Sequence, residues 1–505
     1  MKLVNTSLTM IVAALAAGGL AAPVAQATTL AASAAPTGPM ADFTVGPRYL
    51  TTACQGTSIQ TTHNAAAVIA AAPAGTTFCF AAGTHRIGQT LKPKNGDSLV
   101  GVSGALLTGS IRLPTWTATG GQWRATGHLP AAYAASGQCE NNVANICGLR
   151  EQIFVNGVHL TRVASQAAVK AGTFYANYAT NAIYLGSDPT GKAVEMSKTG
   201  TAIQSTAVGV TVRGLAIEHF ASAPQGGALV VGKQWYVWAN DVRWNHAVGI
   251  MMVTADNARV LRNNVHHNGQ LGMGQYKAVS ATISRNYITA NNTDGFWIAD
   301  WESGGLKTTW STGGSVLENM IHNNLGVGLW SDAYDDNRLF SGNSIRTNAA
   351  DGIRFEIGRN GVIEKNWIAG NGFGTGRNSG TSLWDGGGIN VNTSNTVAVR
   401  NNSVVDNVNG VSIQSRTRGT GPWGTNVLRD VTVSGNFIRM HAGVQSTGMV
   451  QNSGSPIPAG EVVLSANQYR VDSLTAKRFQ RAGVWYTPAT WARAGLDAGS
   501  TYAVG

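Results

Sequence analysis

The feature that most constrains the fold is an asparagine repeat in the second half of the chain. Each copy follows a V/I-x-x-N-x-V/I-x-x-N template, or close to it, and Leu215 fills the first asparagine position one turn earlier. The base period is about 23 residues, as between Asn240 and Asn263, and some intervals are longer because they carry insertions. The first asparagines of the copies are Asn240, Asn263, Asn286, Asn319, Asn343, Asn366, Asn402 and Asn436.

This period excludes several repeat architectures. It is too short for tetratricopeptide or ankyrin units, and the regular leucines of leucine-rich repeats are absent. It matches one coil of a parallel β-helix, in which asparagine suits the turns because it tolerates left-handed backbone. Its side-chain amide can also hydrogen-bond the asparagine of the next coil. We therefore predict an all-β solenoid in which the asparagines have a structural role.

The asparagine repeat of residues 201–445 resembles right-handed parallel β-helix proteins of the pectate-lyase-like superfamily. The N-terminal and C-terminal segments are similar to those of exported bacterial members. The resemblance implies a right-handed solenoid and a carbohydrate-active protein. It leaves the reaction open, because that superfamily includes polysaccharide lyases, glycoside hydrolases, uronate epimerases and adhesins.

The first residues predict an export signal. Lys2 is followed by an uncharged apolar run and by the small-residue site Ala25-Gln26-Ala27, so we expect cleavage after Ala27, with Ala35 as the alternative. The apolar run is too short for a good membrane anchor, and no other long one follows. In an exported chain the even cysteine count indicates disulfides, and nearness in sequence favours two of them over the other pairings: Cys54–Cys79 and Cys139–Cys147.

The order of patterns along the chain predicts the domain organisation. A signal peptide (1–27) and a flexible Ala/Ser/Pro-rich leader (28–45) precede the solenoid. The alanine-rich run ending at Pro73 predicts a short capping helix, and a hairpin is expected at Asn156-Gly157. The remaining segments are an N-terminal cap with the first coils (46–115), an inserted small β subdomain (116–200), the repeat region (201–445) and a C-terminal cap (446–505).

Two acids fall in one column of the predicted solenoid. Counting thirteen residues on from successive template asparagines gives Val253, Tyr276, Ala299, Asp332 and Glu356, and the column continues with Asn392 and Gln414. Neighbouring coils lie about 4.8 Å apart. We therefore expect the Asp332 and Glu356 carboxyl groups about 5 Å apart on one face, with one pKa raised by the like charge. That separation is typical of retaining glycosidases.

The pair is also similar to β-helix glycoside hydrolases such as the β-xylosidase group, which place an aspartate and a glutamate one coil apart. This resemblance implies that Asp332 is the nucleophile and Glu356 the acid/base. Other residues beside the column are candidates for supporting roles. Glu302 is a candidate third catalytic acid, and the candidate substrate-binding residues are Asp300, Lys307, Trp297, Trp301, Trp330, Asn392, His322 and Arg354.

Charge leaves an alternative reaction open. The formal net charge of +11 favours an acidic partner such as a uronate polymer, which a lyase or epimerase would act on. A non-catalytic glycan-binding β-helix is a further alternative. The Gly-His-Gly and Arg-Ile-Lys motifs of polygalacturonases and the W-I-D-H motif of pectate lyases are absent. We expect a secreted monomer with a poly- or oligosaccharide substrate, no nucleic-acid partner and no membrane span. A hydrolase needs no cofactor or metal, whereas calcium is the candidate for a lyase.

Overall fold

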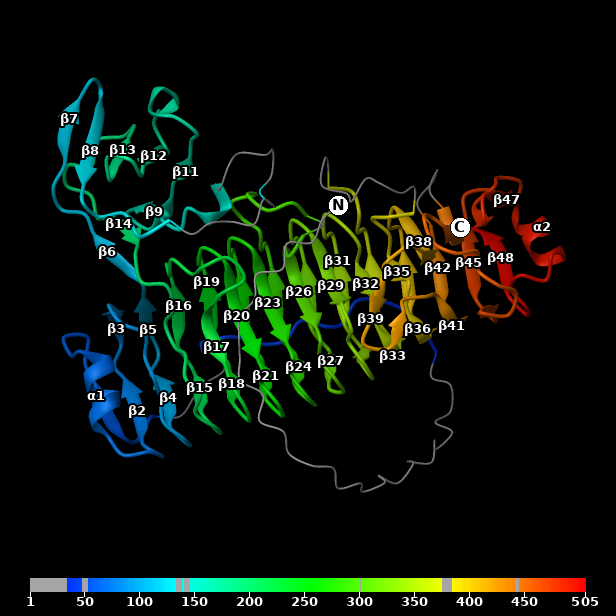
Figure 1. Cartoon of the computed structure of the whole chain (residues 1–505), viewed down its shortest axis with the longest axis horizontal. Coiled ribbons are helices and arrows are strands. Elements are labelled where there is room, and N and C mark those ends of the chain that lie inside the picture. The colour runs from blue at the N-terminus through cyan, green and yellow to red at the C-terminus, as the bar shows by residue number, and fades with distance from the viewer. Residues whose placement is uncertain are drawn as a thin grey trace. The chain divides into compact units, whose positions relative to one another are not determined.

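The computed structural model describes residues 34–47, 53–132, 139, 146–299, 301–374, 384–440 and 445–505. In these ranges the chain winds through three long, mainly parallel sheets, and Figure 1 shows the coils in succession. The first sheet contains β1 (Thr57–Ile59), β2 (Thr77–Phe80), β4 (Ser98–Gly101), β15 (Thr211–Arg213), β18 (Tyr236–Trp238), β21 (Arg259–Leu261), β24 (Thr282–Ser284), β27 (Ser315–Leu317), β30 (Leu339–Ser341), β33 (Arg359–Glu364), β36 (Asn395–Arg400), β41 (Arg429–Ser434) and β44 (Val462–Ser465).

The second sheet follows the first around each coil. It contains β3 (Gly83–Arg86), β5 (Ala105–Thr108), β16 (Ala216–Glu218), β19 (Asp241–Arg243), β22 (Asn264–His266), β25 (Tyr287–Thr289), β28 (Met320–His322), β31 (Ser344–Arg346), β34 (Trp367–Ala369), β37 (Ser403–Val405), β42 (Phe437–Arg439), β45 (Gln468–Val471) and β48 (Thr501–Val504).

The third sheet closes each coil. It contains β17 (Gly227–Val231), β20 (Val248–Val253), β23 (Leu271–Tyr276), β26 (Gly304–Thr309), β29 (Val327–Asp332), β32 (Ile353–Glu356), β35 (Ile389–Asn392), β38 (Asn409–Ser415), β43 (Gln445–Gln451), β46 (Phe479–Arg481) and β47 (Val484–Tyr486), the last of which pairs antiparallel. One residue of each short strand points inward, as Val260, Val265 and Met273 do in successive strands of one coil, and these side chains form a continuous buried core.

The predicted asparagine ladder is confirmed at the bend between the first and second sheets. Asn240 Nδ2 donates to Asn263 Oδ1 over 3.0 Å, and Asn263 makes the same bond to Asn286. A second ladder, formed by the later asparagine of each template, lies between the second and third sheets, as in the 3.0 Å bond from Asn245 to Asn268. These bonds satisfy fully buried amides, so the asparagines hold the coils in register.

The repeat continues farther than the sequence indicated. The residues after 445 were expected to be a cap without the repeat, yet β43, β44 and β45 add a further coil. Asn467 extends the first ladder by accepting from the Asn436 backbone over 3.0 Å. It was missed because its template is degenerate and an insertion precedes it. Near the end of the solenoid, α2 (Pro488–Arg493) buries Trp491 fully in the core, and β48 after it adds the last strand of the second sheet.

The N-terminal part of the described chain combines a cap and an insertion. The predicted capping helix is α1 (Ala65–Ala71), and the disulfides Cys54–Cys79 and Cys139–Cys147 both form. Two small sheets make up the inserted part, including the expected hairpin at Asn156. Their strands are β6 (Ser110–Arg112), β7 (Thr117–Thr119), β8 (Gln122–Thr126), β9 (Ile153–Val155), β10 (Val158–His159), β11 (Thr161–Arg162), β12 (Thr173–Asn177), β13 (Ala182–Leu185) and β14 (Val194–Ser197).

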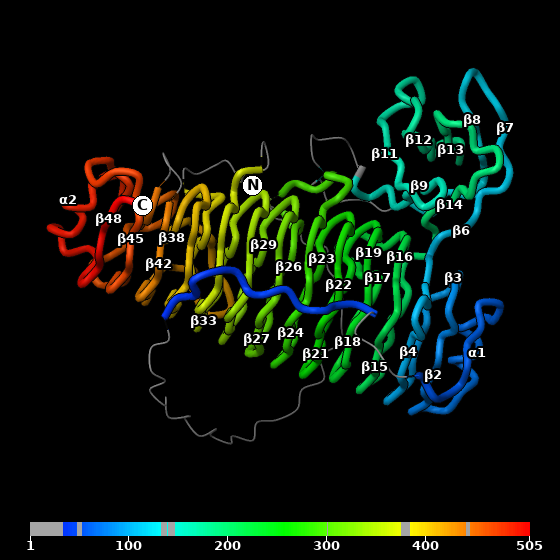
Figure 2. Tube along the Cα trace, turned by 180° about the vertical axis from the view of Figure 1, so that it is seen from behind, coloured from blue at the N-terminus to red at the C-terminus, as the bar shows by residue number. Residues whose placement is uncertain are grey.

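Residues 34–47 lie along the solenoid, where the sequence predicted a flexible leader (Figure 2). The Phe43 backbone donates to the Tyr287 hydroxyl over 3.2 Å, and the Phe43 ring contacts the Tyr287 ring edge-on. Gly46 donates to the Arg262 carbonyl over 2.9 Å. The predicted signal peptide and residues 28–33 lie outside the described residues. Across the described ranges, no helix is long and apolar enough to cross a membrane.

Candidate active site on the third sheet

Asp332 and Glu356 end neighbouring strands of the third sheet. Ser331 of β29 pairs with Phe355 of β32, which places the two acids at the next position of each strand. Phe355 is buried in the core, so alternation along the strand turns Glu356 to the outer face of the coil. The geometry brings the two acids together in one column, as the sequence predicted.

The column differs from the prediction at one coil. Tyr276 pairs with Thr309, and Thr309 pairs with Asp332, so Thr309 takes the place expected for Ala299. The strand of this coil, β26, begins at Gly304. The counting failed because the ten extra residues of this coil precede β26, whereas the alignment assumed that they follow it.

Lys307 connects Asp332 to Glu302. Its ammonium nitrogen lies 2.8 Å from Asp332 Oδ2 and 2.5 Å from Glu302 Oε1. The lysine is buried, and burial lowers its pKa, but the Asp332 and Glu302 charges outweigh burial and raise the pKa above its usual value. Lys307 is therefore a fixed cation that neutralises one carboxylate in the column and one in the loop before β26.

Glu356 lies in a different environment. It is only 4% exposed, and burial, followed by the Asp332 charge, raises its pKa to about 7. Arg418, Arg354 and Lys307 oppose that rise. Arg418 forms an ion pair with Glu356 Oε1, and the Arg354 Nε lies 4.0 Å from Oε2. At neutral pH this carboxyl group exchanges a proton readily, as a general acid/base must.

Trp330 separates two of these cations. The Lys307 ammonium lies 3.7 Å from the centre of the Trp330 ring, and the Arg354 guanidinium lies 4.9 Å from it. The cations come from β26 and β32, the strands on either side of β29. Trp330, a candidate substrate-binding residue by sequence, is 4% exposed, so it does not offer an open ring face to a substrate. Its ring instead positions Lys307 and Arg354 by cation–π contact.

A groove of about 520 Å³ begins at Asp332 and extends over the earlier strands of the third sheet. Lys307, Glu302 and Thr309 line it beside Asp332. The residues that complete its wall are Gln225, Val248, Met251, Leu271, Gly274, Gln275, Tyr276, Trp310 and Ala333. The volume and the mixture of apolar and polar groups suit a small organic ligand.

Other predicted residues take different places. Trp297 is fully buried, stacks on Trp301 and packs against the Cys139–Cys147 disulfide, so it anchors the loop before β26. His322 lies on β28 of the second sheet, where Thr289 Oγ1 lies 3.2 Å from its Nδ1, and is not part of this site. Asn392 follows Glu356 in the column. Asp300 lies outside the described residues.

Metal binding gains no geometric support here. In the described ranges, no group of three or more histidines, cysteines, aspartates or glutamates could hold a metal ion. Asp335, in the turn after β29, is fully buried and accepts from the Ser311 backbone over 2.8 Å and the Ser331 hydroxyl over 2.9 Å. Its carboxylate oxygens are thus occupied by hydrogen bonds that hold the turn after β29.

Two groups of site residues were missed by the sequence analysis. Arg418 lies in the segment between β38 and β41, which also carries the short hairpin β39 (Thr420–Gly421) and β40 (Gly424–Thr425). The long interval between Asn402 and Asn436 was the available signal that this coil carries a projecting loop. Tyr276 and Trp310 also line the groove. The sequence placed Tyr276 in the column of the acids but did not indicate a binding role for it, and it gave no signal for Trp310.

A family model described as the right handed beta helix region matches residues 226–388. Among solved structures, the complex of XylC with xylose has a TM-score of 0.59 at 15% identity, covering 83% of this chain and 82% of that one. The chain is a right-handed parallel β-helix. No curated protein matches its sequence.

Two other similar structures have lower scores. A glycoside hydrolase has a TM-score of 0.42 at 10% identity, covering 80% of this chain and 89% of that one. The A-module of the Azotobacter vinelandii mannuronan C-5 epimerase AlgE6 has a TM-score of 0.41 at 13% identity, with coverages of 87% and 92%. At these identities the likeness concerns the β-helix fold alone.

Proposed function

We propose that this β-helix is a glycan-active enzyme, and specifically a glycoside hydrolase that uses Asp332 and Glu356. The observation that carries the proposal is the contrast between two neighbouring carboxyl groups. Asp332 is paired with the buried ammonium of Lys307, whereas the pKa of Glu356 is raised to about 7. Surroundings of this kind shift the pKa values of two neighbouring acids apart. The acid that stays ionised is then suited to be the nucleophile, and the acid that stays protonated is suited to donate a proton.

In the proposed reaction Glu356 begins protonated and donates its proton to the glycosidic oxygen. Asp332 attacks the anomeric carbon as this bond breaks, and the leaving sugar departs as an alcohol. The resulting glycosyl–Asp332 ester is then attacked by water, which gives its proton to Glu356 and restores both groups. Because Arg418 is ion-paired with Glu356, its side chain must move aside when substrate binds.

A lyase or epimerase is the second candidate, and the cations favour it. Lys307, Arg354 and Arg418 surround the acids and could hold a uronate carboxylate. However, such an enzyme also needs a base to remove a proton from carbon. Lys307 is a poor base because the neighbouring acids raise its pKa. The hydrolase therefore accounts for more of the site.

The direct test is product analysis on neutral and uronic-acid glycans, with xylan and xylo-oligosaccharides first because XylC is described in complex with xylose. Hydrolysis produces reducing ends without absorbance from an unsaturated sugar. Absorbance that depends on calcium would instead support the lyase. Binding without any cleavage would support a glycan-binding β-helix with no catalytic role.

We also propose that the protein is exported and acts outside the cytoplasm. The two disulfides fit an oxidising compartment, and the N-terminal sequence pattern predicts cleavage after Ala27. Expression in a secreting host followed by N-terminal sequencing tests this. A mature chain beginning at Thr28 is expected, and retention of the uncleaved chain in the cytoplasm would contradict it.

A further inference from the structure

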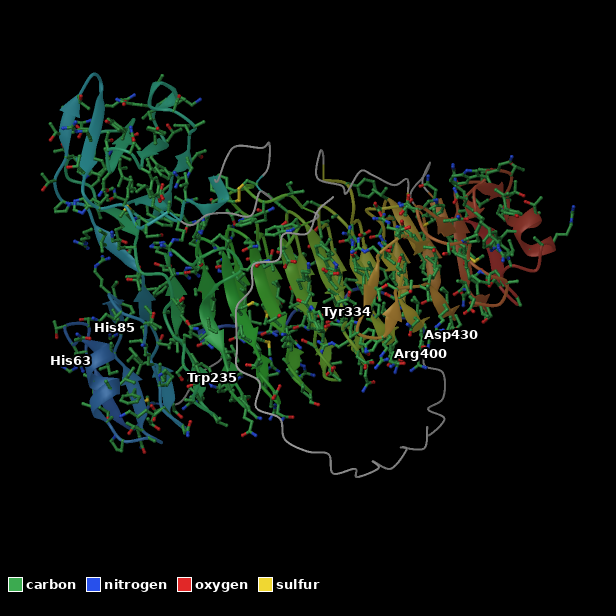
Figure 3. The ribbon with its side chains drawn as sticks, in the orientation of Figure 1. His63, His85, Trp235, Tyr334, Arg400 and Asp430 are labelled. Atoms are coloured by element: carbon green, nitrogen blue, oxygen red, sulfur yellow. A yellow bond between two sulfur atoms is a disulfide. The ribbon has the colours of Figure 1, made fainter. Side chains whose placement is uncertain are left out.

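Three aromatic side chains lie at or just after the ends of strands in the third sheet, and a fourth lies in the β39–β40 hairpin. Tyr276 ends β23, Trp310 follows β26, Tyr334 lies two residues after β29, and Trp423 lies in the turn between β39 and β40. Tyr334 is labelled in Figure 3. We call these four residues the aromatic row. Three of them are among the more exposed large side chains, with Trp310 42% exposed and Tyr276 and Trp423 each 36% exposed.

Three rings of the row contact one another in succession, and Lys277 connects the fourth, Tyr276, to Trp310. Trp310 and Tyr334 meet edge-to-face with ring centres 4.6 Å apart, and Tyr334 and Trp423 do so at 5.8 Å. The Lys277 ammonium lies 5.1 Å from the Tyr276 ring centre and 5.7 Å from that of Trp310. Exposed aromatic side chains that gather in this way require an explanation that single exposed residues do not.

Packing explains part of the row. A Cβ at Gly421 would lie 2.1 Å from the Tyr334 ring, so the β39–β40 hairpin rests directly on that ring. Tyr334 and Trp423 therefore help to position the hairpin that follows Arg418. Tyr276 and Trp310 differ from these two residues, because each is at least 36% exposed and both form part of the wall of the groove that begins at Asp332.

A second hollow lies farther from the acids, next to the groove along the same sheet. Val253 pairs with Tyr276, and Val253 also lines this second hollow of about 920 Å³. Thus one column of paired residues, from Val253 through Tyr276 and Thr309 to Asp332, passes through both hollows. It crosses three coil steps, which is roughly 14 Å at the spacing of parallel strands. Polar groups including Lys92, Lys233 and Asp256 line the far hollow.

We propose that Tyr276 and Trp310 form a stacking track for a linear glycan of several pyranose units. The glycan crosses the coils and places one end at Asp332. The proposal rests on the proposed function for its choice of ligand. It adds that the substrate is an oligosaccharide of several units, because a disaccharide at the acids would leave the far hollow empty. Pyranose rings present apolar C–H faces that stack on aromatic rings, and their hydroxyl groups suit the polar far hollow.

The test is calorimetric binding by a Glu356→Gln protein, which keeps every residue of the groove wall. The ligands are xylohexaose, cellohexaose, hexagalacturonate and hexamannuronate, each with its disaccharide. At least one hexasaccharide is expected to bind about tenfold more tightly than its disaccharide. Adding Trp310→Ala or Tyr276→Ala should weaken hexasaccharide binding about tenfold and leave disaccharide binding nearly unchanged. Trp238→Ala, on β18 of the first sheet, is the matched control.

Several outcomes separate this proposal from the hydrolase. Row variants that bind hexasaccharides like the parent protein would overturn the track, even if the wild type cleaves glycans. Row-dependent binding with no cleavage by the wild type would support the track and overturn the hydrolase. Thermal melts identify any variant that does not fold. In that case Trp310→Phe, which keeps an aromatic ring, must restore chain-length-dependent binding, and failure to do so would count against the track.

Discussion

The Lys307 ammonium lies 2.8 Å from Asp332 Oδ2 although the lysine is buried. Lys307→Met keeps an unbranched apolar side chain but leaves Asp332 and Glu302 without their common cation. Removing one member of a buried ion pair costs about 3 kcal/mol, and the partial exposure of the two acids keeps the loss near that lower limit. Urea unfolding should show this loss. Lys277→Met, at an exposed position, should change stability by less than about 0.5 kcal/mol. Equal effects of the two changes would contradict the assigned role.

Glu356 makes the fold sensitive to pH. Its pKa is raised from 4.5 to about 7 in the folded state, so below pH 4.5 the group is neutral in both states and costs nothing. Between these values the unfolded chain ionises while the folded chain stays protonated, and stability falls by roughly 3 kcal/mol. Glu356→Gln removes this loss, so its stability relative to wild type should rise between pH 4 and pH 8. Unfolding midpoints measured across this range test it, with the surface variant Glu318→Gln as control.

Arg418 influences the protonation of Glu356. Its charge lowers the pKa of Glu356, so Arg418→Met should raise that pKa further. If Glu356 must be protonated to act as the acid, the alkaline limb of the kcat/KM profile should move to higher pH. Arg429→Met, at an exposed position beyond the same hairpin, should leave the limb in place. An Arg418 variant with an unchanged alkaline limb would indicate that another group is the acid.

The asparagine ladder makes each interior member important for stability. Asn319 is fully buried and accepts from both the backbone and the side chain of Asn286. Asn319→Ala would leave those donors unsatisfied and should cost about 1–3 kcal/mol. The partly exposed Asn395 of β36 is the control, and its alanine variant should be nearly neutral. The difference between the two variants in denaturant unfolding measures the ladder's contribution.

The fold could be predicted from the sequence because the asparagine pattern repeats from coil to coil. Each asparagine satisfies buried polar groups in two coils, so period and residue type together indicate a β-helix. The repeat also placed Asp332 next to Glu356. The prediction failed where an insertion interrupts the period, as at Ala299 and Asn467. Counting residues does not show on which side of a strand the inserted residues lie.

Counting residues along the repeat could not predict contacts between separate loops. Arg418 reaches Glu356 from a hairpin more than one coil later, and Trp297 packs on a disulfide of the inserted subdomain. Trp330 was expected to bind substrate, but Lys307 and Arg354 lie against its ring. These positions depend on where loops return to the third sheet, which no local pattern in the chain specifies.

The most direct test of the central claim follows the anomeric configuration of the product by NMR during cleavage of a glycan that the wild type hydrolyses. The account predicts retention for the wild type. It also predicts loss of cleavage in Asp332→Asn, and rescue of a Glu356→Gln protein only with substrates whose leaving group needs no proton. Full activity in the Asp332→Asn variant, or an unsaturated product in place of a reducing sugar, would contradict it.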